Sequence, residues 1–88
     1  MATRLAIIGS SSGLHARPAS LFTQAAAAAG HEVMIGREDG PAVPAQSVLM
    51  VMSLGLRHGD TVVLSADDAA GPVLDDLVAL LARDLDAS

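Results

Sequence analysis

The residues most able to do chemistry lie near the start of the chain, in residues 13–19, which read Gly-Leu-His-Ala-Arg-Pro-Ala. His15 stands where a Ser/Gly-rich loop leads into a segment that favours helix. The first amides of a helix have no partner within it and carry a partial positive charge, so a helix start binds an anion well. Pro18 gives up a donor that the first turn does not use. Arg17 adds a planar cation that suits phosphate oxygens.

These features would allow His15 to carry a phosphoryl group on a ring nitrogen. Imidazole titrates near neutral pH, so a neutral ring with a free lone pair exists in cells. The helix amides and Arg17 would hold the transferred group, with about 1.5–3 kcal/mol for each hydrogen bond to a charged partner. The chemistry alone leaves a second interpretation open, in which His15 only caps the helix.

The apolar run at residues 48–52 predicts a docking surface. A short helix with one side on a sheet cannot bury apolar side chains all round, so some should face solvent next to His15. The candidates for this docking patch are Val48, Leu49 and Met52. Methionine suits a surface that accepts more than one partner. For Met50 and Val51 we expect ordinary core packing instead.

The remaining polar residues do not form a catalytic or metal-binding pattern. His31 and His58 are far apart and favour surface positions, and Asp67 and Asp68 favour a turn and a helix start rather than a pair of catalytic carboxylates. The chain has no cysteine, which excludes disulfides and cysteine zinc sites. We therefore expect no metal and no cofactor.

The elements that must position His15 follow from periodicity and turn residues. Strands are predicted at residues 3–9, 32–37, 41–45 and 61–66. Helices are predicted at residues 16–29, 48–54 and 70–85. An apolar stripe supports the last helix: Leu74, Leu77, Val78, Leu81 and Leu85. Pro41 and Pro44 predict that the third strand lies at a sheet edge.

The predicted order is β-α-β-β-α-β-α. Four short strands cannot be covered on both faces by three helices, so the helices should gather on one face. We expect an α+β fold, a two-layer open-faced sandwich with a four-stranded antiparallel sheet.

Composition narrows the class of protein further. The 88 residues suit one domain with a modest core and leave little room for a deep substrate pocket. Five cations, all arginine, stand against ten acids, and with one Phe, no Tyr and no Trp this argues against nucleic-acid binding. The apolar run at 5–8 is too short for a signal peptide or a membrane span. A cytoplasmic monomer without membrane insertion is expected.

Two segments resemble one family. Residues 13–19 are similar to the active-site signature of HPr, the histidine-containing phosphocarriers of the bacterial phosphoenolpyruvate-dependent sugar phosphotransferase system. Residues 46–55, Gln-Ser-Val-Leu-Met-Val-Met-Ser-Leu-Gly, resemble the family's regulatory-serine segment, which usually reads Lys-Ser and then an apolar run ending in Met-Ser-Leu-Gly. The resemblance covers essentially the whole chain and implies a single HPr-like domain over residues 1–88.

The resemblance implies a phosphoryl relay. Enzyme I, phosphorylated from phosphoenolpyruvate, would transfer its phosphoryl group to Nδ1 of His15, and the chain would donate it to a IIA domain of a sugar permease. Arg17 would neutralise the group, the backbone amides of Ala16 and Arg17 would bind its oxygens, and Ser12 would have a supporting role. Such a chain is a carrier and not an enzyme in its own right.

Ser47 corresponds to a serine that is phosphorylated in some relatives, so a serine kinase/phosphorylase is a further expected partner. A phosphate would add about −1.5 to −2 charges beside the docking patch and repel an acidic partner. Ser47 also suits a helix N-cap. Gln46 stands where the family usually has Lys, so the pattern supports this modification less than the chemistry at His15.

Two alternatives to sugar uptake stay open. One is a carrier in a regulatory branch, whose output controls other proteins. The other is an α+β interaction domain that never carries phosphate. A free-standing enzyme fits least, because a surface nucleophile at a helix start offers no enclosed pocket.

Overall fold

A four-stranded sheet forms one layer of the molecule in the computed structural model, which describes residues 1–85. Its strands are β1 (Ala2–Ile7), β2 (Met34–Arg37), β3 (Ala42–Pro44) and β4 (Thr61–Ala66). They lie in the order β1-β4-β2-β3, and every neighbouring pair is antiparallel. β2 and β3 are neighbours both in the sequence and in the sheet, whereas the connections from β1 to β2 and from β3 to β4 each pass a strand that lies between their ends.

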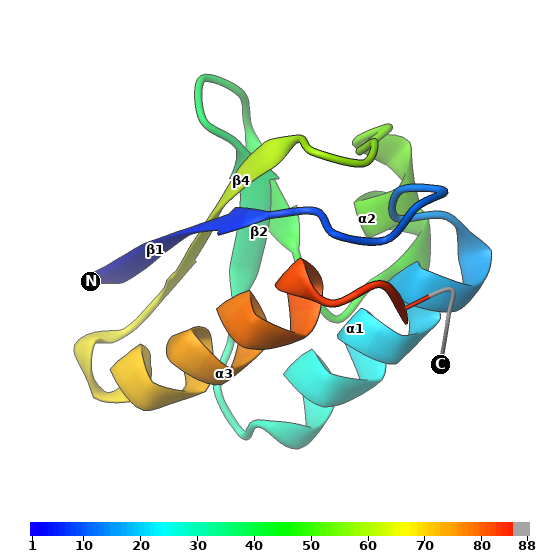
Figure 1. The fold of residues 1–88 in the computed structure, drawn as a ribbon. Coiled ribbons are helices and arrows are strands. Elements are labelled where there is room, and N and C mark those ends of the chain that lie inside the picture. Colours follow the sequence, from blue (N-terminus) through cyan, green and yellow to red (C-terminus); the bar gives the residue numbers. More distant parts are fainter. Residues whose placement is uncertain (86–88) are drawn as a thin grey trace.

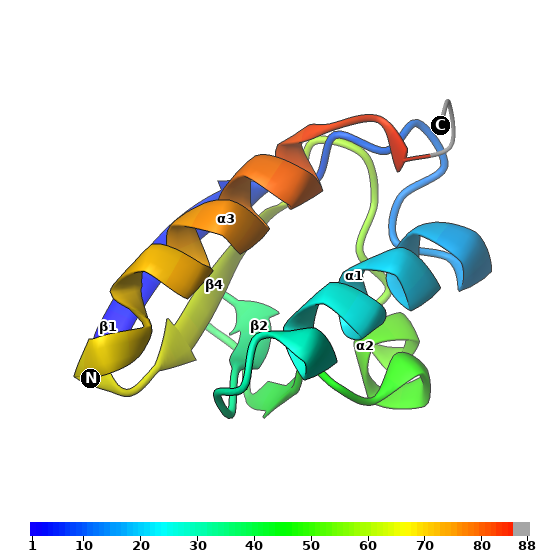
Figure 2. The same cartoon turned by 90° about the horizontal axis from the view of Figure 1, so that it is seen from below.

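Three helices form the second layer. They are α1 (Ala16–Ala28), α2 (Val48–Ser53) and α3 (Gly71–Ala82), and a 3-10 turn, η1 (Asp68–Ala70), precedes α3. All three helices lie on the same side of the sheet (Figures 1 and 2). The predicted α+β open-faced sandwich is confirmed.

The hydrophobic core lies between the two layers. Along β4, Val62 and Leu64 are fully buried while Val63 is only half-buried, which is the alternation of a strand covered on one face. Phe22 from α1 and Leu74 from α3 belong to the same buried cluster. Burial of each such side chain stabilises the fold by about 1.5–3 kcal/mol.

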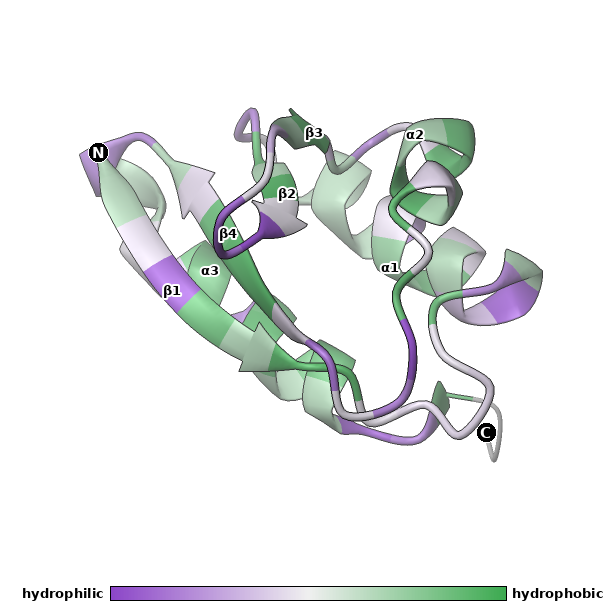
Figure 3. Cartoon of the chain, turned by 90° about the horizontal axis from the view of Figure 1, so that it is seen from above, coloured by the Kyte–Doolittle hydropathy of each residue, from purple (hydrophilic) through white to green (hydrophobic). Residues whose placement is uncertain are grey.

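The opposite face of the sheet is open. Leu5 and Ile7 of β1 alternate with buried Ala6 and are 60% and 56% exposed. Figure 3 shows that the half of β1 nearer its arrowhead is hydrophobic.

The third strand lies at the edge of the sheet, as its prolines predict. β3 pairs only with β2, and Pro44 faces Met34 in that ladder. A proline has no N–H to donate, so an edge is where such a strand is tolerated.

The predicted end of the last helix is wrong. α3 ends at Ala82 and not at residue 85, although Leu85 is buried as the apolar stripe required. The chain leaves the helix after Ala82 and returns to the loop before α1, where the Leu85 amide donates to Ser10 Oγ at 3.2 Å. Leu85 is thus buried after α3 has ended, and its tertiary contact with the loop before α1 decides where the helix ends.

The predicted first strand also ends early. It ends at Ile7, because the Gly9 amide donates to Leu81 O at 2.8 Å instead of continuing the sheet ladder.

None of the helices within residues 1–85 has the length and apolar character needed to cross a membrane.

Candidate functional site

His15 is the N-cap residue of α1. Its backbone is extended (φ −85°, ψ −166°), and its carbonyl accepts the first intrahelical hydrogen bond from the Ala19 amide at 2.8 Å. Its side chain is exposed and makes no capping hydrogen bond. The imidazole is therefore accessible from solvent, at the end of the helix that carries the partial positive charge.

The next residues give this helix start the character of an anion site. The amides of Ala16 and Arg17 come before the first intrahelical bond, and Pro18 has no amide hydrogen. Ala16 and Arg17 are exposed, whereas Pro18 and Ala19 are buried and anchor the first turn in the core. The structure thus brings a nucleophilic ring, two backbone donors and a guanidinium residue to one end of α1.

The backbone before His15 is held tightly against a second loop. Gly13 has a left-handed backbone (φ 79°), and a Cβ atom there would lie 2.3 Å from Leu56 O. The next residue, Leu14, is buried and donates its amide to that same oxygen at 3.1 Å. Glycine at position 13 is therefore required both by conformation and by the close approach of the chain.

The loop is also held by the segment that follows α3. The Ser11 amide donates to the Asp84 carboxylate at 3.2 Å, and its hydroxyl does so at 3.4 Å. Ser10 is buried, and Ser12 is exposed in the same loop.

The short helix α2 lies beside α1 (Figure 2). Ser47 is its N-cap, as predicted, and its hydroxyl accepts from the Met50 amide at 3.3 Å. Leu49 is 81% exposed, and Figure 3 shows α2 as mostly hydrophobic. Val48 and Met52 are half-buried, and Met52 packs against the core.

The expected burial of Met50 is wrong: this side chain is 43% exposed, and of the expected core pair only Val51 is buried. Successive helical residues are rotated by about 100°, so Met50 points well away from the direction in which the neighbouring Val51 meets the core. Met50 therefore belongs to the exposed apolar surface together with Leu49.

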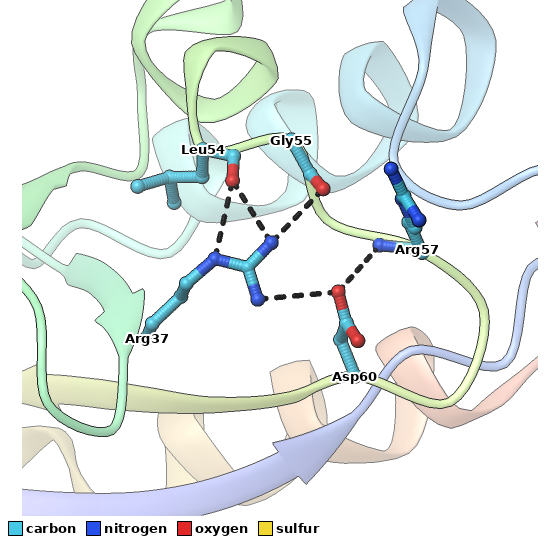
Figure 4. A network of polar contacts seen from close by, with 5 residues as sticks. All are labelled: Arg37, Leu54, Gly55, Arg57 and Asp60. Carbon is cyan, nitrogen blue, oxygen red and sulfur yellow. Dashed lines mark hydrogen bonds and ion pairs between the residues drawn. The ribbon is translucent and has the colours of Figure 1, made fainter.

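A polar network joins the end of α2 to β2 and to the turn before β4, and it was not predicted from the sequence. Arg37 donates to the carbonyls of Leu54 and Gly55 at the end of α2, and its Nη1 lies 3.2 Å from the Asp60 carboxylate (Figure 4). Asp60 also accepts from the Arg57 amide at 2.8 Å. That backbone hydrogen bond is the main cause, and Arg37 a further cause, of an Asp60 pKa below its ordinary value, against an opposing effect of burial.

The other two histidines and the paired aspartates lie outside the loop and the helix that carry His15. His31 Nδ1 lies 3.7 Å from the Asp67 carboxylate at the far end of β4, and His58 is exposed in the turn before β4. Asp67 precedes η1, as its predicted role at a helix start requires. Within residues 1–85, no three His, Asp or Glu side chains come close enough together to hold a metal ion.

The fold and the site together define a class: a small open-faced α+β protein with an exposed histidine at the start of its first helix. The family model described as the PTS HPr component phosphorylation site matches residues 2–83. The phosphocarrier protein HPr of Streptomyces coelicolor is 44% identical over 87 residues, which cover 98% of this chain and 94% of that one. The HPr of Haloferax volcanii is 45% identical over 71 residues, or 78% of this chain and 80% of that one. This chain belongs to the HPr family of phosphocarrier proteins of the phosphotransferase system.

Solved structures agree with this assignment. HPr-C-His from Thermoanaerobacter tengcongensis is 33% identical and superposes with a TM-score of 0.85, covering 98% of this chain and 97% of that one. HPr from Bacillus anthracis is 28% identical with a TM-score of 0.82, covering 91% and 95%. The resemblance seen in the sequence is confirmed over nearly the whole chain.

Proposed function

We propose that this chain, as a single HPr-like domain, accepts a phosphoryl group from phosphorylated Enzyme I on Nδ1 of His15. It then donates the group to a IIA domain of a sugar permease. The observation that carries this proposal is the exposed His15 side chain, which caps no helix amide although it occupies the N-cap position of α1. A histidine that served only as a cap would use a ring nitrogen for that purpose.

The transfer itself needs only a lone pair and a site for charge. The lone pair on Nδ1 of His15 attacks phosphorus, the bond from phosphorus to the donor breaks, and its electron pair stays with the donor. The amides of Ala16 and Arg17 and the Arg17 guanidinium bind the phosphoryl oxygens, with Ser12 in a supporting role. When a IIA domain takes the group, a lone pair of its acceptor attacks phosphorus, the bond from phosphorus to Nδ1 breaks, and the electron pair of that bond returns to Nδ1 of His15.

Partner proteins dock on α2 beside this site. The docking patch consists of Val48, Leu49 and Met52, and the exposed Met50 extends it. Apolar side chains with flexible methionines suit a surface that meets a donor and an acceptor in turn. We propose that the chain acts as a cytoplasmic monomer, without a metal or a cofactor.

Ser47 is a proposed site of regulatory phosphorylation by a serine kinase/phosphorylase. Its hydroxyl lies at the start of α2, next to the docking patch. A phosphate there would place about −1.5 to −2 charges where an acidic partner approaches.

A regulatory carrier is the second candidate function. The HPr-like protein Crh of Halalkalibacterium halodurans is 44% identical over 52 residues, or 59% of this chain. The solution structure of Crh, described as the Bacillus subtilis catabolite repression HPr, is 27% identical with a TM-score of 0.63 over 91% of this chain. These similarities favour a test for output to regulatory proteins as well as to IIA domains.

The decisive experiment is incubation of the chain with phosphoenolpyruvate and purified Enzyme I. We expect a phosphorylated species that is acid-labile and alkali-stable, the behaviour of a phosphohistidine. It should vanish in His15→Ala and persist in Ser47→Ala and in His58→Ala, the exposed histidine that serves as control. Label that persists in His15→Ala would place the acceptor elsewhere and overturn the proposal.

A further inference from the structure

Arg37 joins three segments that are distant in the sequence. It is the last residue of β2, and its guanidinium donates to Leu54 O at 3.1 and 3.3 Å and to Gly55 O at 3.0 Å. The same guanidinium lies 3.2 Å from the Asp60 carboxylate (Figure 4). One cation therefore fixes the end of the docking helix α2 and the turn before β4 to the same point on the sheet.

The turn held by Arg37 also supports the proposed phosphoryl site. Leu56 O accepts the Leu14 amide at 3.1 Å, immediately before the acceptor histidine. Within the same turn, the Gly59 amide donates to Ile8 O at 2.8 Å. The loop that leads to the imidazole thus hydrogen-bonds to residues 56–60. The Arg37 guanidinium binds Asp60 in this turn and the carbonyls of Leu54 and Gly55 just before it.

We propose that Arg37 is a positioning residue for phosphoryl transfer, which sets the position of the docking patch on α2 relative to the imidazole of His15. This inference rests on the proposed function, because it concerns transfer to and from that imidazole. A partner bound to α2 must bring phosphorus into line with a nitrogen of the ring, and a misplacement of about 1 Å can cost about 100-fold in rate. Arg37 touches no reacting atom and acts only through the segments it holds.

A purely structural role makes a different kinetic prediction. If Arg37 only stabilised the fold, its loss would lower the folded fraction, and cooling would restore full activity. If it positions α2, the loss persists in fully folded protein. The docking patch itself stays intact, so binding is kept and the rate of the chemical step falls.

The test compares Arg37→Met with Arg4→Met as a matched control. Arg4 and Arg37 have side chains that are 40% and 41% exposed, and Arg4, in β1, pairs with Asp75 of α3 at 2.8 Å. Phosphorylation by Enzyme I is followed at steady state, at a temperature where circular dichroism shows every variant folded. We expect kcat of Arg37→Met to fall about three- to thirtyfold, with KM within about twofold of wild type. Arg4→Met should match wild type in both.

Two further measurements sharpen the result. Arg37→Lys should recover only part of kcat, because an ammonium cannot reach both carbonyls and the carboxylate in the planar arrangement that guanidinium uses. Amide hydrogen exchange at Leu14 should be faster in Arg37→Met and unchanged in Arg4→Met, because only the first variant releases the turn that carries Leu56.

The possible outcomes distinguish the positioning role of Arg37 from the proposed function of His15. An unchanged kcat in Arg37→Met, a change in KM alone, or an equal loss in Arg4→Met would overturn the positioning role while leaving His15 as the acceptor. Absence of label on His15 in the wild type would instead overturn the proposed function, and the positioning role with it.

Discussion

The side chain of His15 combines exposure with the absence of a capping hydrogen bond, and this sets it apart from residues that merely begin helices. The backbone performs the structural task, since the His15 carbonyl accepts from Ala19 at 2.8 Å. The ring is left available for chemistry. At the scale of single residues, function therefore depends on which neighbours can stabilise charge on this ring and on what keeps its backbone in place.

In the proposed function, Arg17 supplies a permanent positive charge beside the phosphoryl group. Arg17→Ala should fold normally, because the residue is exposed, and should slow both transfer steps about 10- to 100-fold, the effect of losing a hydrogen bond to a charged group. Rapid-quench measurements of phosphorylation by Enzyme I and of donation to a IIA domain check this. Arg83→Ala, an exposed arginine after α3, is the control and should transfer at the wild-type rate. Wild-type rates in both steps for Arg17→Ala would contradict its assigned role.

Gly13 and Gly30 form a matched pair for testing the support of His15. Both have a left-handed backbone, with φ 79° and 78°, but a Cβ atom would meet Leu56 O only at Gly13, and nothing lies within 4 Å at Gly30. Gly30→Ala should cost about 1–2 kcal/mol of unfolding free energy from backbone strain alone. Gly13→Ala should cost clearly more and should also slow phosphoryl transfer. Urea denaturation and the Enzyme I assay measure both, and equal effects of the two variants would contradict the close contact.

Some single residues could be placed from the sequence and others could not. His15 at a helix start follows from local signals, a Gly/Ser loop before it and a proline after it. Arg37 has partners 17, 18 and 23 residues away, and no local pattern marks such pairings. The predicted burial of Met50 was wrong for a related reason. Whether a residue of a short helix faces the core depends on how the helix is rotated against the sheet, and the periodicity of six residues does not determine that rotation.

At the scale of elements, α2 separates exposed from buried apolar residues within a few positions. Leu49→Ala should leave the free energy of unfolding nearly unchanged, because this side chain is 81% exposed. It should raise KM for Enzyme I with little change in kcat, because the contact contributes to docking and not to chemistry. Val51→Ala is the control: it removes a fully buried side chain and should cost about 2 kcal/mol of stability. An unaltered KM in Leu49→Ala would remove this side chain from the docking patch.

The ends of some helices and strands are determined by the local sequence, and the ends of others by tertiary contacts. The strand at residues 61–66 was predicted with its observed bounds, because alternation and flanking turn residues agree there. The last helix was not, since no glycine or proline marks its end after Ala82 and the chain turns to bury Leu85 against the loop before α1. Such an end is set by what the next residues can bury.

At the scale of the whole molecule, the strand order β1-β4-β2-β3 is what brings the functional pieces together. β1 and β4 are neighbours, so the loop that leaves β1 toward His15 runs beside the turn that enters β4. The fold class could be predicted from counting elements and their apolar faces. The contact between these two loops could not, because it depends on which strands pair.

The turn before β4 should make the stability of the whole fold depend on acid. The hydrogen bond from the Arg57 amide, assisted by Arg37, holds the pKa of Asp60 below its ordinary value of 3.8. A carboxylate with a lowered pKa in the folded state stabilises the fold above its unfolded pKa, and this contribution is lost as pH falls through the folded value. Urea midpoints should therefore fall as the pH drops through and below the ordinary pKa of an aspartate, where Asp60 takes up its proton. Asp60→Asn should flatten that part of the profile and lower the midpoint at pH 7. A profile as steep as that of the wild type would show that acid acts on the fold through other carboxylates, such as Asp68, whose pKa is also lowered by its ion pair with the N-terminus.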